Sequence, residues 1–231
     1  MNATLSRRPL RRFWGWGVAC EHLTQEESAR IGMMVQMLGG QITDRTEPQV
    51  SDFTLPAPRI APPAALAAMF SDTPLDRLNH AMGKSYADLA RMWLRQVPHV
   101  PDWVAYPDDE QAVIDILDWA SRHNVAVIPY GGGSSVCGGV EAAVGSSYAA
   151  AVSLDMERLN RVLEVDPTSR AARIQAGALG PELEAQLKQS LQQAMGSATR
   201  ANFETGSVTW KKAKDSVVLD LTRLDRKSTR L

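Results

Sequence analysis

A glycine-rich loop between two apolar segments constrains the fold of this chain more than any other feature. The stretch 127–140, VIPYGGGSSVCGGV, contains five glycines, two serines and no charged residue. Glycine permits positive φ angles and close approach to the backbone, so such a loop can turn several backbone N–H groups toward one anion. We therefore expect an anion-binding loop here, and a cofactor's pyrophosphate is the anion that we favour.

The elements expected around this loop define the fold class. A helix is expected to begin at Asp108, an N-cap residue that Gln111 can reach back to, and to end near His123. Its apolar face would consist of Ala112, Val113, Ile116, Leu117 and Ala120. A second helix is expected from Gly180, with Pro181 at its first position. Strands are expected over residues 101–107, 125–129, 150–155, 161–166 and 170–176.

The first hundred residues read as helical and extended. Thr24 and Glu27 form a capping-box pair at the start of a helix expected over Thr24–Leu38. Another helical stretch is expected over Leu75–Val97. The proline-rich segment Glu47–Pro63 between them favours an extended connector along the surface.

The order of elements excludes one common nucleotide-binding architecture. In a doubly wound dinucleotide fold the glycine loop leads straight into a helix, whereas here it leads to strands. We therefore expect an α+β fold in which a β-α-β unit is followed by antiparallel strands, preceded by a helical N-terminal segment.

Composition narrows the class of protein. The 231 residues carry a net charge of −1, so nothing global favours nucleic acid as a partner. The two cysteines, Cys20 and Cys137, are too few for a disulfide framework, and no apolar run approaches the length of a transmembrane segment. We expect a cytoplasmic protein. The four histidines are spread out without metal-ligand spacing, so no metal ligand is assigned.

Several motifs together resemble a known flavoprotein family. The loop itself, the strand pattern that follows it and a later A-G-x-x-G-x-x-L-E segment all match, and so do two N-terminal segments. The matching segments are residues 13–17, 77–86, 101–107, 128–139, 152–161 and 176–184. They resemble the FAD-binding domain of the vanillyl-alcohol oxidase (PCMH-type) superfamily, and within it the alkyldihydroxyacetonephosphate synthase group. The resemblance extends over roughly residues 10–188.

The resemblance implies a cofactor and a set of binding residues. In this superfamily the FAD pyrophosphate lies over the glycine loop and accepts hydrogen bonds from its amides. Carried over to this sequence, the FAD-binding residues are Pro129, Tyr130, Gly131, Gly132, Gly133, Ser134 and Ser135. Some relatives attach FAD through a histidine at the place where this chain has Ser134, so FAD is expected to bind non-covalently. No catalytic residue is assigned.

The end of the chain departs from the family pattern. The resemblance implies an incomplete FAD-binding subdomain at 101–188, after an N-terminal region at 1–100 and before a cap domain that the sequence does not continue into. Residues 189–231 form a non-family tail. In it, Val217–Arg226 repeats Val152–Arg161 at six of ten positions. Asp225–Leu231 also matches one reading frame of a sequencing-adapter oligonucleotide. We therefore expect a chimeric or adapter-derived tail.

Three functions remain open from the sequence. The first is the FAD-binding portion of an oxidoreductase or alkyl transferase of the alkylglycerone-phosphate synthase type, whose full-length form takes a small-molecule substrate. The second is part of an FAD-linked 2-hydroxy-acid (D-lactate or glycolate) dehydrogenase. The third is a catalytically inactive truncated fragment, or a module that only binds partners. Whether this chain itself is an enzyme, and its oligomeric state, stay undecided.

Overall fold

A computed structural model describes residues 5–41, 46–166, 169–195, 209–213 and 216–220, with side chains described up to residue 190. The chain divides into two compact units, residues 1–158 and 159–231, and each is described by itself. The domain boundaries expected at residues 100 and 188 stay predictions. No helix in the described ranges is long and apolar enough to cross a membrane.

The predicted first helix is confirmed as α1, Gln25–Met37. The Thr24 side chain accepts from the Glu27 backbone N–H while the Glu27 carboxylate accepts from the Thr24 backbone, which completes the capping box. The proline-rich segment contains a short 3₁₀ helix, η1 (Val50–Asp52), and a second one, η2 (Ala64–Met69), follows it.

The single helical stretch expected over Leu75–Val97 is wrong, because the chain forms two short helices there. They are α2, Pro74–Asn79, and α3, Tyr86–Trp93. Ser85 starts the second helix with its own capping box, in which Asp88 is the partner. Between the helices, Gly83 comes so close to Ser135 that a Cβ there would overlap the Ser135 carbonyl oxygen. The turn therefore lets this part of the chain lie directly against the glycine loop.

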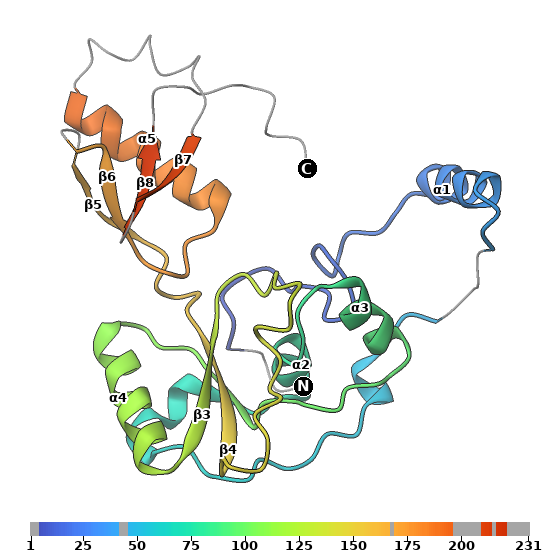
Figure 1. Cartoon of the computed structure of the whole chain (residues 1–231), viewed down its shortest axis with the longest axis horizontal. Coiled ribbons are helices and arrows are strands. Elements are labelled where there is room, and N and C mark those ends of the chain that lie inside the picture. Colours follow the sequence, from blue (N-terminus) through green and yellow to red (C-terminus); the bar gives the residue numbers. More distant parts are fainter. Residues whose placement is uncertain (1–4, 42–45, 167–168, 196–208, 214–215, 221–231) are drawn as a thin grey trace. The chain divides into compact units, whose positions relative to one another are not determined.

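A four-stranded sheet forms the centre of the first unit (Figure 1). Its order is β1 (Phe70–Ser71), β2 (Trp103–Ala105), β4 (Ala150–Asp155), β3 (Val125–Tyr130). Strands β2 and β3 both run parallel to β4, while β1 is antiparallel to β2. Every residue of β4 is buried, as expected for a central parallel strand. The glycine loop follows β3 directly.

The helix α4, Glu110–Arg122, lies beside β3 (Figure 1). The predicted N-cap at Asp108 is wrong: Asp109 caps the helix, since its carboxylate accepts from the Ala112 backbone N–H at 2.8 Å. Asp108 instead pairs with two arginines from other segments. The predicted apolar face is confirmed for Ala112, Ile116 and Ala120, which are buried, whereas Leu117 is 44% exposed.

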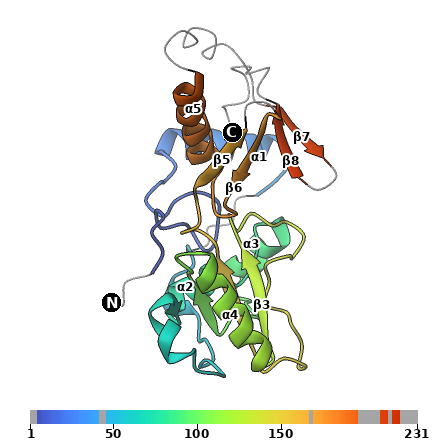
Figure 2. The same cartoon turned by 90° about the vertical axis from the view of Figure 1, so that its left-hand side faces the viewer.

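The second unit is antiparallel. Its sheet order is β5 (Val162–Asp166), β6 (Ala171–Ile174), β8 (Ser216–Asp220), β7 (Thr209–Ala213). Helix α5, Gly180–Met195, packs along β5 (Figure 2). The first four residues of the repeat Val217–Arg226 fall on β8. Its other six residues and the adapter-like segment lie outside the described residues. The α+β class is confirmed, with a parallel β-α-β unit followed by antiparallel strands.

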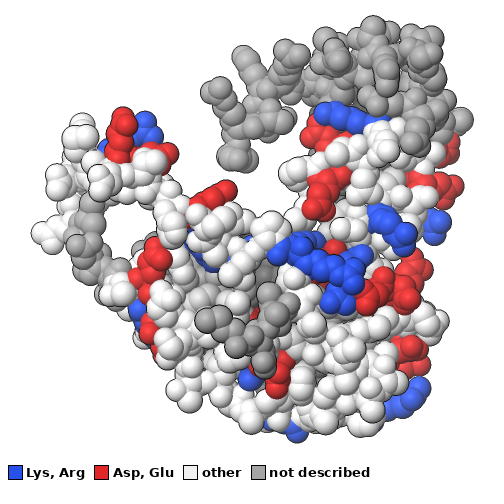
Figure 3. Space-filling model, turned by 180° about the vertical axis from the view of Figure 1, so that it is seen from behind, with Lys and Arg blue, Asp and Glu red and all other residues white. Residues whose placement is uncertain are grey.

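Charge is distributed without a dominant sign. Figure 3 shows basic and acidic side chains interspersed over the visible face, in agreement with the net charge of −1.

Candidate FAD-binding site

The glycine loop is held by hydrogen bonds to its carbonyl oxygens. Arg8 Nη1 donates to the Gly131 oxygen at 2.9 Å, and Arg11 Nη1 donates to the Gly132 oxygen. At the far end of the loop, the Lys84 backbone N–H donates to the Ser135 oxygen at 2.7 Å. Three carbonyls of one short loop are therefore occupied by donors from the N-terminal half of the chain.

The N–H groups of the same loop have no hydrogen-bond acceptor in the part of the chain that the structure describes. Within the described part of the chain, no backbone N–H from Gly131 to Ser135 donates to a protein acceptor. Gly133 is nevertheless buried. Buried backbone donors are almost always paired with some acceptor. A run of donors without protein acceptors therefore fits a bound anion such as a pyrophosphate.

Gly133 is a position where only glycine fits. Its φ is +66°, and a Cβ built there would overlap the hydroxyl of Tyr130. Both the left-handed backbone and the close approach of the ring therefore require the missing side chain.

The side chains of the predicted FAD-binding residues have different surroundings. Tyr130 is buried, its hydroxyl donates to the Asn79 carbonyl at 3.0 Å, and burial raises its pKa. Through this hydrogen bond Tyr130 ties the start of the loop to the end of α2. Ser135 Oγ accepts from the Gly139 N–H at 3.0 Å and so closes the next turn. Pro129 and Ser134 are exposed.

The N-terminal segment Ser6–Phe13, called here the N-terminal strap, was not assigned a role from sequence. The sequence shows a basic cluster, Arg7, Arg8, Arg11 and Arg12, which favours a solvated terminus over contact with an acyl-phosphate substrate or an anionic surface. The structure shows Arg8 and Arg11 on the glycine loop instead. Their partners lie more than 120 residues away in sequence, so no local pattern signals the contact.

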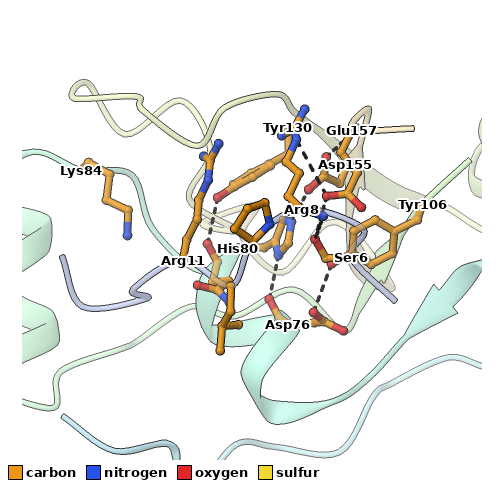
Figure 4. A pocket seen from close by; sticks show the side chains of 13 residues that line it. Ser6, Arg8, Arg11, Asp76, His80, Lys84, Tyr106, Tyr130, Asp155 and Glu157 are labelled. Carbon is orange, nitrogen blue, oxygen red and sulfur yellow. Dashed lines mark hydrogen bonds and ion pairs between the residues drawn. The ribbon is translucent and has the colours of Figure 1, made fainter. Parts of the chain in front are cut away.

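A buried polar network lies beneath the loop (Figure 4). His80 Nδ1 lies 2.7 Å from the Asp76 carbonyl and its Nε2 lies 2.9 Å from the Asp155 carboxylate. Its ring packs on Tyr130 with centroids 4.1 Å apart. Because a carbonyl only accepts, Nδ1 must carry a proton. His80 therefore links the end of β4 to the start of the glycine loop.

The cavity beside this network is small. Its volume is about 50 Å³, and the strap, His80, Tyr106 and Tyr130 are among its walls. Such a space can hold water molecules but not a flavin. This cavity by itself is therefore too small to enclose a flavin.

Lys84 lies partly buried at the edge of the same cavity. Its Nζ donates to the carbonyls of Arg12 and Phe13 at 3.0 and 3.1 Å. Burial, with a contribution from the neighbouring Arg11, lowers the pKa of this amine to about 8. Lys84 thus ties the end of the strap to the turn that contacts Ser135.

Comparison with known proteins supports the flavoprotein assignment. Residues 101–203 match the family model described as FAD binding domain. Alkyldihydroxyacetonephosphate synthase of Dictyostelium discoideum is 40% identical over 122 residues, which are 53% of this chain and 20% of that protein. A solved structure of alkyldihydroxyacetonephosphate synthase aligns with a TM-score of 0.67 and 31% identity, and covers 78% of this chain and 38% of that one.

The alternative enzyme class is also similar, over a shorter stretch. D-2-hydroxyglutarate dehydrogenase of Xanthomonas citri pv. viticola is 34% identical over 87 residues, or 38% of this chain and 17% of that protein. The chain thus spans about a fifth of the length of the curated relatives that it matches. Residues 101–203 therefore match the FAD binding domain family, and the chain is similar to alkyldihydroxyacetonephosphate synthases.

Proposed function

We propose that this chain binds FAD non-covalently by placing the cofactor's pyrophosphate over the glycine loop. The binding residues are those expected from sequence, Pro129, Tyr130, Gly131, Gly132, Gly133, Ser134 and Ser135. One observation carries the proposal: consecutive loop N–H groups have no protein acceptor in the described chain, while their carbonyls are held from the other side. An anion on the open side would satisfy them.

Different residues of the loop would bind the pyrophosphate and hold the loop in place. The amides of Gly131, Gly132 and Gly133 would donate to phosphate oxygens, and the exposed Ser134 would add a neutral hydroxyl donor. Tyr130 would keep the loop in place through its bond to Asn79. A serine cannot form the covalent link that a histidine makes, which is why the attachment is proposed as non-covalent.

The activity of the longer protein is a separate proposal. We propose a flavoenzyme of the alkyldihydroxyacetonephosphate synthase type, because the similarity to that group covers 53% of this chain and extends to the fold. Bound flavin would supply the redox or adduct chemistry, and the protein would supply position and electrostatics. No residue described here is assigned to the reacting atoms or to substrate.

Non-covalent FAD binding is tested on the purified chain. FAD is titrated while the quenching of flavin fluorescence is followed, and the loaded protein is then precipitated with acid. We expect saturable binding with all flavin released into the supernatant. Absence of binding would refute the cofactor proposal, and flavin retained in the pellet would refute its non-covalent part.

The enzyme class is tested on a longer relative that contains the same loop. Formation of an alkyldihydroxyacetonephosphate would support the synthase proposal. Turnover of D-2-hydroxyglutarate instead would favour the dehydrogenase class.

A further inference from the structure

The N-terminal strap makes contacts with the glycine loop that FAD binding alone does not explain. Two of its arginines donate to consecutive loop carbonyls, Arg8 to Gly131 and Arg11 to Gly132. Figure 4 shows both side chains beside Tyr130, where the loop begins. These guanidinium groups bind the carbonyl oxygens of the loop, whereas the proposed anion would bind its N–H groups. The two arginines therefore act on the loop and not as direct ligands of the anion.

The strap is fixed at both ends, so these contacts are built into the fold. At one end, Glu157 is 4% exposed and accepts from Ser6 Oγ at 2.7 Å and from the Arg7 backbone N–H at 2.5 Å. At the other end, Lys84 binds the carbonyls of Arg12 and Phe13, and the Phe13 ring is buried in a core cluster.

Peptide geometry links each arginine to one donor of the loop. In a planar trans peptide, the C=O of one residue and the N–H of the next point in opposite directions. Arg8 on the Gly131 carbonyl therefore turns the Gly132 N–H away from the strap. Arg11 on the Gly132 carbonyl does the same for the Gly133 N–H. Both N–H groups are among those without an acceptor in the described residues.

Electrostatics adds to this orientation. A hydrogen bond from a guanidinium is charge-assisted and is stronger than a neutral one. Because hydrogen bonds in a chain polarise one another, a cation on the carbonyl strengthens the N–H donor of the same peptide. The positive charge of the arginines would thus reach the anion through two peptide groups.

We propose that Arg8 and Arg11 are positioning residues for the pyrophosphate, which orient and polarise the Gly132 and Gly133 N–H groups from the side opposite the cofactor. This inference rests on the proposed FAD binding. The N-terminal strap would accordingly be part of the cofactor site without touching the cofactor.

The test compares ligand affinities of matched variants of the full chain. FAD and ADP, which share the pyrophosphate, are titrated by calorimetry into the wild-type chain and four variants. The variants are Arg8→Met, Arg11→Met, Arg8→Lys and Arg11→Lys. Arg7→Met is the control, because the Arg7 side chain on the same strap is mostly exposed and pairs only with Asp108 among the described residues. We expect each Met variant to weaken both ligands about tenfold, each Lys variant to restore part of the loss, and Arg7→Met to stay within about twofold of wild type.

A spectroscopic readout separates positioning from general structural support. In ¹H–¹⁵N spectra of ligand-free protein, the Arg11→Met variant should shift the Gly133 amide and the Arg8→Met variant the Gly132 amide. The melting temperature should stay nearly unchanged in Arg11→Met, whereas Arg8→Met should lower it, because Arg8 also pairs with the buried Glu157 carboxylate at 3.9 Å. Unchanged FAD and ADP affinity in the Met variants, or an equal loss in Arg7→Met, would overturn the inference. Wild-type protein that binds neither ligand would overturn the proposed function itself.

Discussion

The sheet β1-β2-β4-β3 and the hairpin β5–β6 differ in how much of each is buried. All residues of β4 are buried, and the cluster around it includes Ile116 and Trp119 from the neighbouring helix. In β5, by contrast, no residue is fully buried, and the apolar cluster beside it has two buried members, Leu183 and Leu187 of α5.

This difference explains where the candidate site lies. The glycine loop follows β3 of the buried sheet and is further held by the strap and by the turn at Gly83. A loop that must keep several N–H groups aimed at one anion needs such a rigid base. The hairpin offers no comparable support, so we expect it to contribute less to stability and to the site.

The largest effect is expected from breaking the buried sheet at Asp102. Its carboxylate accepts from the Ala151 N–H at 2.7 Å, from the Arg59 N–H at 2.8 Å and from the Arg59 guanidinium. Burial alone would raise the pKa of Asp102, but these hydrogen bonds outweigh it and lower the pKa. Asp102→Ala should cost about 3–5 kcal/mol in urea unfolding. Asp118→Ala, which removes an exposed pair, should cost less than about 0.5 kcal/mol, and similar losses in both variants would contradict the comparison.

A matched pair of core truncations compares the two regions directly. Ile116 is fully buried beside the sheet, whereas Leu187 lies in the smaller cluster of α5. Ile116→Ala should lower the free energy of unfolding by about 3–5 kcal/mol and Leu187→Ala by about 2 kcal/mol. Chemical denaturation of both variants measures these losses of unfolding free energy. A larger loss in Leu187→Ala would show that the hairpin unit is the better packed of the two.

The lowered pKa of Lys84 should make the stability of the chain depend on pH. Its pKa is about 8 in the folded chain and near 10.5 when unfolded. Between these values the unfolded state binds more protons, so the free energy of unfolding should rise with pH. The rise relative to Lys84→Met should be about 1–3 kcal/mol from pH 8 to 10.5, with no difference in slope below pH 8. Parallel curves for the two proteins above pH 8 would contradict the lowered pKa of the Lys84 amine.

A more local stability effect is expected within the loop itself. Gly133→Ala places a Cβ against Tyr130 at a φ of +66°, whereas Gly138, at +74°, has nothing within 4 Å of an added Cβ. Gly138→Ala should cost about 1 kcal/mol for backbone strain, and Gly133→Ala about 1–2 kcal/mol more. Thermal unfolding measures both. Only Gly133→Ala should also weaken FAD binding, and equal FAD affinity in the two variants would place the cofactor elsewhere.

Local patterns predicted much of the fold and the position of the loop. Apolar periodicity and turn residues located all five strands expected around the loop as well as α1, α4 and α5. The break between α2 and α3 was signalled by Ser85 and Asp88, a capping-box pair inside the stretch that was read as one helix. At the start of α4, Asp108 and Asp109 are both suitable N-cap residues. Asp108 forms ion pairs with Arg7 and Arg158, and Asp109 caps the helix.

The support of the loop could not be predicted in the same way. The pairs His80–Asp155 and Arg8–Gly131 join residues that are 75 and 123 positions apart. Such contacts depend on how β4, the strap and the turn at Gly83 come together, and no spacing in the sequence encodes them. A basic terminus that reads as solvated therefore lies on the candidate site.

The most direct test of the account is a titration of ¹⁵N-labelled chain with FAD, followed by ¹H–¹⁵N spectra. If the pyrophosphate lies over the glycine loop, the amides of Gly131, Gly132, Gly133, Ser134 and Ser135 should show the largest shifts, and ADP should reproduce them. Binding of FAD with these amides unmoved, and shifts gathered elsewhere, would contradict the central claim.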